Sequence, residues 1–248
     1  MRRLAKKLLP GRLLRATRRL RTRAAWVRTL AGPYAPRPRE RTAFAPASVL
    51  VIAPHIDDEI IGAGGTLLRL HDAGAEITVA YVFCGGNAVR CREAEAVRDR
   101  AGWRDLRFAN LPDREQVAAG AALPGGLLAG DWDEVYLPHP HDNHPAHLAL
   151  PRLLLPQLQA LPQPLPLYLY EVWTPLMPGV IVDISPVLER KLALLGLFAS
   201  QLAAKDYVAA TEGLARYRAL GLPRRGGAAE VFFESTVSGY AGLAGIGE

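Results

Sequence analysis

Residues 55–59, with the sequence HIDDE, place an imidazole and three carboxylates directly after an apolar run that reads as a buried strand. His55 and Asp58 are three positions apart, so both side chains can reach one cation, and zinc accepts such ligands in open catalytic sites. Asp57 stands where a base for a metal-bound water is needed, and Glu59 could cap the next helix or support a ligand. The alternative is an ordinary strand-to-helix loop, although capping needs one carboxylate and no histidine.

A second cluster supplies candidates for a third ligand, because four of the six histidines lie within residues 139–147, HPHDNHPAH. This segment follows residues 132–137, which read as another short strand. Loops at the carboxyl ends of parallel strands converge on one crevice, so the two clusters are expected to face each other. His71 falls in an expected helix, where a surface or satisfied histidine is the simpler interpretation. His139 and His141 are expected to be exposed loop residues, with metal contact as the alternative.

Three motifs resemble the signature of the PIG-L/LmbE-like zinc deacetylases, which remove acetyl groups from N-acetylated amino sugars: PHIDDE at 54–59, GAGG at 62–65 and DNHPAH at 142–147. The resemblance extends over about residues 48–240. It implies that His55, Asp58 and His147 hold zinc, and ferrous iron would also fit two histidines and one carboxylate. It further implies that Asp57 is the general base and that His144 stabilises the charged intermediate.

Two positions depart from the family pattern. Ile56 stands where proline is common, which puts the rigidity of the loop in doubt. Ala146 stands where aspartate is common, which removes a carboxylate that could orient a neighbouring histidine, and Asp142, on the other side of His144, is a candidate for that role. The implied reaction is a hydrolysis in which Asp57 takes the proton of a zinc-activated water and His144 stabilises the resulting oxyanion.

Other residues are candidates for the substrate pocket. An arginine at the place of Arg92 contacts sugar hydroxyls in the family; a solvated helix charge is the alternative, and Glu95 lies on the same expected helix. Asp113 falls where relatives carry a substrate-contacting aspartate, although Pro-Asp is also an ordinary turn. Glu171 and Trp173 follow a further strand and could line the sugar pocket, with core packing the expected role of Trp173.

The alternation of strand-like and helical segments predicts an α/β fold, a three-layer αβα sandwich with a mainly parallel, Rossmann-like sheet. Expected strands are 49–53, 76–83, 135–137, 167–170 and 180–184, and expected helices are 67–73, 92–101, 148–161, 187–201 and 207–220. The GAGG motif is a poor dinucleotide fingerprint because the preceding acids would repel phosphate. Its glycines are expected to let a helix approach the sheet closely.

The N-terminal segment differs in composition from the rest, since residues 1–41 hold 14 of the 30 Lys and Arg residues and one of the 24 acids. Leucines recur there at helical intervals, a pattern typical of a segment that lies on an anionic membrane surface. It lacks the apolar core of a signal peptide, and no run approaches a membrane span. A disordered tail, a helix that docks on a partner protein and a nucleic-acid arm are the alternatives, the last least favoured because stacking aromatics are absent.

The expected organisation is therefore a basic amphipathic segment and a Pro/Arg-rich linker at 1–46, followed by a deacetylase domain at 47–248. Residues 1–31 would contact a membrane or membrane protein, and no nucleic acid is expected as a partner. Cys84 and Cys91 are interpreted as free thiols of a cytoplasmic enzyme at the inner membrane face, with a disulfide as the alternative.

The expected function is zinc-dependent removal of the N-acetyl group from an N-acetylated amino sugar, a GlcNAc-type glycoconjugate that is lipid-linked or part of a cell-envelope glycan. The alternatives are an amidase acting on a different amino-sugar conjugate and a non-catalytic carbohydrate-binding protein. The complete set of expected ligands and the intact base Asp57 favour an enzyme over the binding protein.

Overall fold

The computed structural model describes residues 38–112, 122–224 and 226–246. One sheet of eight strands has the order β1-β7-β8-β6-β5-β2-β3-β4. The strands are β1 (Arg39–Glu40), β2 (Ser48–Ala53), β3 (Glu76–Tyr81), β4 (Asp105–Phe108), β5 (Glu134–Pro138), β6 (Leu167–Tyr170), β7 (Val180–Asp183) and β8 (Ala229–Ser235). Strands β2 to β6 pair in parallel, whereas β8 is antiparallel to both of its neighbours, β6 and β7.

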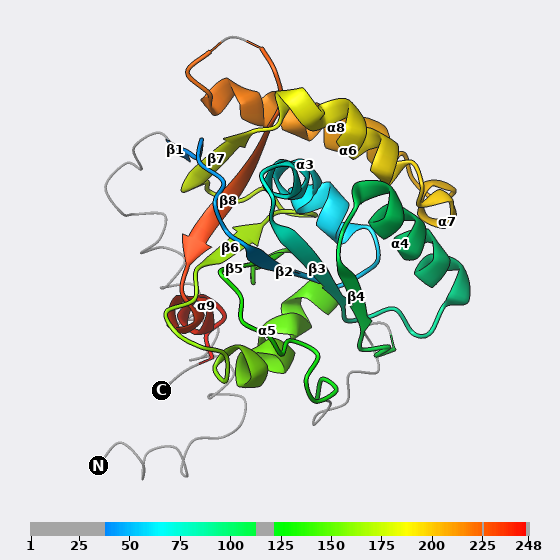
Figure 1. Cartoon of the computed structure of the whole chain (residues 1–248), viewed down its shortest axis with the longest axis vertical. Helices are drawn as coiled ribbons and strands as arrows, with labels where there is room; N and C mark the ends of the chain where they lie inside the picture. The colour runs from blue at the N-terminus through cyan, green and yellow to red at the C-terminus, as the bar shows by residue number, and fades with distance from the viewer. Residues whose placement is uncertain (1–37, 113–121, 225, 247–248) are drawn as a thin grey trace.

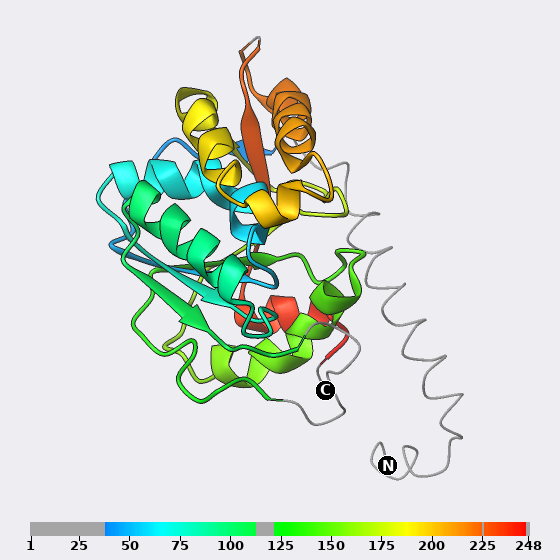
Figure 2. The same ribbon diagram turned by 90° about the vertical axis from the view of Figure 1, so that its right-hand side faces the viewer.

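Helices cover both faces of this sheet (Figures 1 and 2). They are α3 (Asp58–Asp72), α4 (Ala88–Ala101), α5 (Pro145–Leu158), α6 (Leu188–Leu195), α7 (Ala199–Leu202), α8 (Tyr207–Arg218) and α9 (Val237–Leu243). Along β2, Val49 and Val51 belong to the core beneath α3, α4 and α6, while Leu50 and Ile52 belong to the core beneath α5 and α9. Successive side chains of a strand point to opposite faces, so one buried strand serves two cores. The predicted α/β class with a mostly parallel sheet is confirmed.

Helix α3 begins at Asp58, about nine residues before the predicted start, and its first half contains the GAGG motif. A Cβ atom on Gly62 would lie 2.2 Å from the ring of Tyr170, and one on Gly65 would lie 2.8 Å from the side chain of Ile184. Glycine has a low helix propensity, so the sequence did not predict a helix over this half of α3. Close packing on the sheet compensates for that low propensity. The predicted close approach of these glycines to the sheet is present.

Three other regions differ from the sequence expectation. Helix α4 begins at Ala88, capped by the side chain of Asn87, rather than at Arg92. The helix expected over 187–201 is divided into α6 and α7. Strands β4 and β8 and helix α9 had no prediction, and β8 is the strand that joins β6 to β7.

The described part of the expected linker belongs to the folded domain. Strand β1 pairs in parallel with β7, and Arg41 is 7% exposed. The Arg41 guanidinium donates to both carboxylate oxygens of Glu134, at 2.8 and 2.9 Å. The fold therefore includes residues before the expected boundary at 47, and the amphipathic prediction for 1–31 lies outside the described residues.

The cysteines and the lack of a predicted membrane span are two further features that the structure describes. Cys84 and Cys91 are free thiols, as expected, and the Cys84 thiol lies 3.1 Å from the side-chain oxygen of Asn110. Across 38–112, 122–224 and 226–246, no helix is long and apolar enough to span a membrane.

Candidate active site

The site lies where β2 and β5 end at the carboxyl edge of the sheet. The loop after β2 carries His55 and Asp57 into α3, and the loop after β5 carries His144 to the start of α5. The ring centroid of His55 is 4.9 Å from that of His144 and 5.4 Å from that of His147. The two sequence clusters therefore face each other.

Two of the three residues predicted as metal ligands, His55 and His147, lie close to the same carboxylate oxygen of the third, Asp58. Asp58 Oδ2 lies 3.1 Å from His55 Nδ1 and 3.1 Å from His147 Nε2. His147 is fully buried, and its Nε2 atom has no hydrogen-bond partner of good geometry among the described residues. On the other side of the ring, Nδ1 lies 3.0 Å from Asp142 Oδ2, and Asp142 also accepts from the backbone N–H of Trp173. Asp142 thus orients His147, which is the neighbouring histidine that the prediction left unnamed.

This arrangement fits a cation. The Asp142 carboxylate only accepts hydrogen bonds, so His147 Nδ1 carries a hydrogen, and Nε2 is the ring nitrogen that can offer a lone pair to a metal ion or hold a second proton beside Asp58. Two acceptor atoms 3.1 Å apart attract a positive charge between them. Burial alone would lower the pKa of His147. The negative charges of Asp58 and Asp142 have a larger effect and raise this pKa to about 9, so the surroundings of the ring favour a positive charge there. The donor types and the orientation by Asp142 suit zinc.

A second possible ligand set overlaps with the first. Ligand atoms of His55, His144 and His147 all lie within 4.8 Å of one another. The sets share His55 and His147, and they differ in whether His144 or Asp58 completes the coordination. The role of His144 therefore decides between them.

Asp57 is held in a strained backbone conformation, with φ of 131°. Its carbonyl accepts from the N–H groups of Ile60 and Ile61 at 3.0 Å, and its own N–H donates to Glu59 Oε2 at 3.1 Å. Strain of this kind persists only where the surroundings impose it, and it is common in active sites. Burial and the neighbouring carboxylates of Asp58 and Glu59 raise the pKa of Asp57 well above its ordinary value, so this carboxylate accepts a proton readily.

Glu59 supports the base loop. Its side chain is fully buried and accepts from the hydroxyl of Tyr81 at 2.8 Å and from the N–H of Asp57. Burial raises the pKa of Glu59 to about 8, against the opposing effect of the Tyr81 hydrogen bond. Glu59 therefore connects the loop of Asp57 to strand β3.

A cavity of about 140 Å³ opens at this cluster. It is lined by His55, Asp57, Asp58, Ile61, Arg90, His144, Trp173, Gln201 and Tyr207. Trp173 is 41% exposed, so the expected core packing of this residue is wrong. Its ring stacks on His144 with centroids 5.6 Å apart, and Lys205 Nζ lies 4.4 Å from the ring centroid of Trp173.

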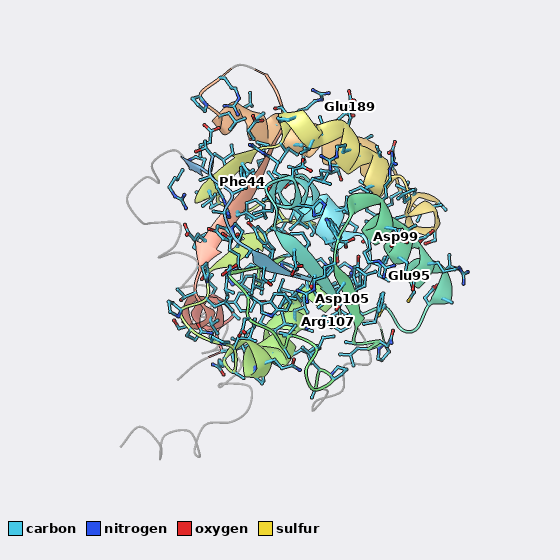
Figure 3. The ribbon with its side chains drawn as sticks, in the orientation of Figure 1. Phe44, Glu95, Asp99, Asp105, Arg107 and Glu189 are labelled. Atoms are coloured by element: carbon cyan, nitrogen blue, oxygen red, sulfur yellow. The ribbon has the colours of Figure 1, made fainter. Side chains whose placement is uncertain are left out.

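The two predicted substrate residues that the structure describes, Arg92 and Glu171, do not line the cavity. Arg92 is exposed on α4 and does not line the cavity, whereas Arg90, two residues earlier, does. Glu95 is exposed farther along the same helix (Figure 3). Glu171 is 4% exposed and is held by the guanidinium of Arg218 at 2.8 Å, so it fixes a loop instead of facing the cavity. Asp113 lies outside the described residues.

His139 and His141 are partly buried, so their expected exposure is wrong. The His139 ring packs edge-on against Phe233, and His141 Nε2 lies 2.7 Å from the carbonyl oxygen of Leu243. Burial and the neighbouring His141 lower the pKa of His139 to about 4. Both histidines fasten the loop after β5 to the C-terminal part of the domain.

The fold and the site together define an α/β protein with a histidine and carboxylate centre of hydrolase type at the carboxyl edge of its sheet. Residues 50–156 match the model of the PIG-L family, described as GlcNAc-PI de-N-acetylase. A curated relative from Bacillus cereus, probable N-acetyl-alpha-D-glucosaminyl L-malate deacetylase 2, is 26% identical over 183 residues, which are 62% of this chain and 83% of the relative. The resemblance to the PIG-L deacetylases is thereby confirmed, and it supports a deacetylase.

Solved structures share the fold. The conserved protein TT1542 from Thermus thermophilus has a TM-score of 0.62 and 23% identity, over 76% of this chain and 94% of that chain. N,N'-diacetylchitobiose deacetylase from Pyrococcus horikoshii has a TM-score of 0.60 and 24% identity, over 79% of this chain and 86% of that chain. At these identities the likeness concerns the fold, and the reaction has to be argued from the site.

Proposed function

We propose that the chain is a metal-dependent N-deacetylase that hydrolyses the acetamide of an N-acetylated amino sugar, a GlcNAc-type glycoconjugate. The observation that carries this proposal is the position of Asp57 in one cavity with His55 and Asp58, whose Oδ2 atom also lies 3.1 Å from the buried His147. Hydrolysis of an amide by water requires a base beside a group that polarises the carbonyl. The match of residues 50–156 to a family of deacetylases supports the same reaction.

His55, Asp58 and His147 would hold the metal, with zinc as the proposed ion and ferrous iron as an alternative that accepts the same ligands. A bound divalent cation supplies a Lewis acid that polarises the acetamide carbonyl and makes water a better nucleophile near neutral pH. Asp142 fixes the tautomer of His147 for this purpose.

Asp57 moves the proton. Burial, Asp58 and Glu59 raise its pKa, so it accepts a proton from the attacking water as the new C–O bond forms. The carbonyl oxygen then carries the negative charge. Asp57 returns the proton to the amide nitrogen as the C–N bond breaks, which leaves a free amino sugar and acetate. This sequence balances without any further reactant.

His144 is the residue proposed to stabilise the oxyanion. Its ring is held between His55 and the indole of Trp173. One well-placed donor of this kind contributes about 3 kcal/mol to transition-state stabilisation in other hydrolases. Arg90 and Trp173 then offer the substrate a cationic donor and a partly exposed aromatic face in the same cavity.

Acetate release tests the proposal. The purified, metal-loaded protein is incubated with a panel of N-acetylhexosamine conjugates, free and lipid-linked, in the presence and absence of a chelator. We expect release from at least one conjugate, loss of activity with chelator and recovery with added zinc or ferrous iron. The matched control is Asp57→Asn, which removes the base and keeps the shape of the side chain.

The same panel includes amino-sugar conjugates with acyl groups other than acetyl. Turnover of these alone would show an amidase of different specificity at the same metal centre. Saturable sugar binding by the wild type with no turnover of any member would instead show a carbohydrate-binding protein, and the proposal would be wrong.

A further inference from the structure

Gln201 lies in the wall of the cavity although it is far in sequence from the metal motifs. It belongs to the single-turn helix α7, next to the wall residues Trp173 and Tyr207. The neighbouring Ser200 donates to Glu93 of α4 twice, from its N–H at 2.8 Å and from its hydroxyl at 2.6 Å. Helix α7 is therefore fastened to α4, and this contact fixes the backbone at Gln201.

The side-chain amide nitrogen of Gln201, Nε2, is buried and makes no hydrogen bond with residues 38–112, 122–224 and 226–246. A buried donor without an acceptor destabilises the folded state, because the group loses its water and gains nothing in exchange. A leucine at this position would avoid that loss. The sequence keeps a donor there instead, at the surface of the cavity that holds Asp57 and His144.

We propose that Gln201 is a substrate-binding residue whose side-chain N–H donates to a hydroxyl oxygen of the amino-sugar ring. This inference rests on the proposed function. A carboxamide N–H can donate to a sugar hydroxyl oxygen without adding a charge to the wall, where the cation is Arg90. The partly exposed ring of Trp173 borders the same space, and an aromatic ring beside a planar polar donor suits a pyranose ring, which has an apolar C–H face and hydroxyls at its edge.

The test compares two glutamines with opposite surroundings. In Gln157, the side-chain oxygen accepts from Leu128 N–H at 3.1 Å and the side-chain nitrogen donates to the carbonyl of Pro124 at 2.9 Å. Gln157→Leu removes satisfied hydrogen bonds outside the cavity, so we expect it to lower Tm by about 4 °C or more and to leave kcat/KM unchanged. Gln201→Leu removes an unsatisfied donor, so we expect an equal or higher Tm together with a roughly 10- to 100-fold lower kcat/KM.

The measurements are Tm, bound metal, steady-state acetate release and calorimetric titration with an N-acetylhexosamine conjugate. The conjugate is the best substrate of the wild type or, if none is turned over, the member of the panel that the wild type binds most tightly. Support requires that Gln201→Leu keep its metal and weaken sugar binding by about 10-fold or more. A Gln201→Leu protein with a lowered Tm and wild-type kcat/KM would show a structural role, and one with both values unchanged would show no role; either result overturns the proposal.

The two proposals fail in different ways. If the wild type releases acetate and Gln201→Leu is equally active, the deacetylase assignment stands and the role of Gln201 is wrong. If the wild type releases no acetate, the deacetylase assignment fails, and the titration still decides about Gln201. Absence of saturable binding of any sugar conjugate to the wild type would then refute Gln201 as a sugar ligand.

Discussion

Replacing Lys191 by methionine should lower the free energy of unfolding by about 3–5 kcal/mol, because it removes one partner of a buried ion pair. The side chains of Lys191 and Glu230 are 1% and 4% exposed, and Lys191 Nζ lies 2.6 Å from Glu230 Oε1. Without Lys191, the Glu230 carboxylate stays buried with no cation, and the desolvation of that charge is no longer offset.

The contacts of the pair extend this effect to helix α3. Glu230 accepts from the N–H groups of Gly65 and Thr66 at 2.8 and 2.7 Å, and Lys191 Nζ donates to the carbonyl of Ile61 at 2.9 Å. In a regular α-helix, the carbonyl of residue 61 receives the N–H of residue 65. The ion pair therefore forms hydrogen bonds with the N–H of Gly65 and the carbonyl of Ile61, which belong to the same turn of α3.

Urea unfolding followed by circular dichroism measures the loss, with the m-value used to check that the transition stays two-state. The matched control is Arg216→Met, which breaks an exposed i,i+4 pair with Glu212 whose side chains are 58% and 36% exposed. Pairs of that kind contribute about 0.3–0.5 kcal/mol. For a domain of this size the Lys191→Met loss corresponds to a Tm lower by about 6–20 °C. Equal urea midpoints for Lys191→Met and Arg216→Met would refute the reasoning.

Three further predictions follow from the site and the tail. Asp57→Asn should keep bound metal and lose most turnover, while His147→Ala should lose metal. His144→Ala should keep metal if His144 stabilises the oxyanion. Loss of metal from His144→Ala, measured by mass spectrometry, would show that His144 is a ligand. His139 is buried with a pKa of about 4, so between pH 6.5 and pH 4 the unfolded state binds more protons than the folded state. The free energy of unfolding should therefore decrease as the pH is lowered through this range. The loss attributable to His139 at pH 5 is about 2 kcal/mol, and His139→Gln should show a smaller difference between its urea midpoints at pH 8 and pH 5; an unchanged difference would contradict this. A chain that begins at Pro38, which keeps the buried Arg41, should fail to sediment with anionic liposomes that recover the full chain, and equal recovery would exclude a membrane role for the basic segment.

The meeting of the proposed base and metal ligands could be predicted because these residues are close in sequence and lie at strand ends. The apolar run of β2 and its sharp end at Pro54 place His55 and Asp58 at the carboxyl edge of the sheet. The same topology brings His147 from the end of β5 to the same edge. The sequence could not show which histidine Asp142 orients, because that depends on how the loop after β5 folds.

The error at Arg92 has a geometric cause. Two residues in an α-helix are related by a rotation of about 200°, so a side chain two positions away points to nearly the opposite face. Helix α4 begins at Ala88, where Asn87 caps it after Gly85 and Gly86 adopt positive φ angles. The resemblance indicated Arg92, at the predicted start of the helix, whereas the structure has Arg90 in the wall of the cavity and Arg92 exposed.

Strand β8 was missed because it does not alternate. Four successive residues, from Ala229 to Phe232, are buried between helices on both faces of the sheet, so the period-2 pattern of a half-buried strand is absent. Its antiparallel pairing with β6 and β7 also follows from the tertiary arrangement, since neither neighbour is adjacent to it in sequence.

The two halves of the cavity therefore have different origins, and this has a consequence for substrate choice. The proposed base and the proposed metal ligands come from two contiguous motifs, so the proposed hydrolysis depends on residues that are close together in sequence. The opposite wall, which includes Gln201 and Tyr207, depends on the division of the expected helix 187–201 and on the contact of Ser200 with Glu93. Because these contacts are long-range, we expect related chains to keep the reaction while the substrate changes with α4, α7 and the start of α8.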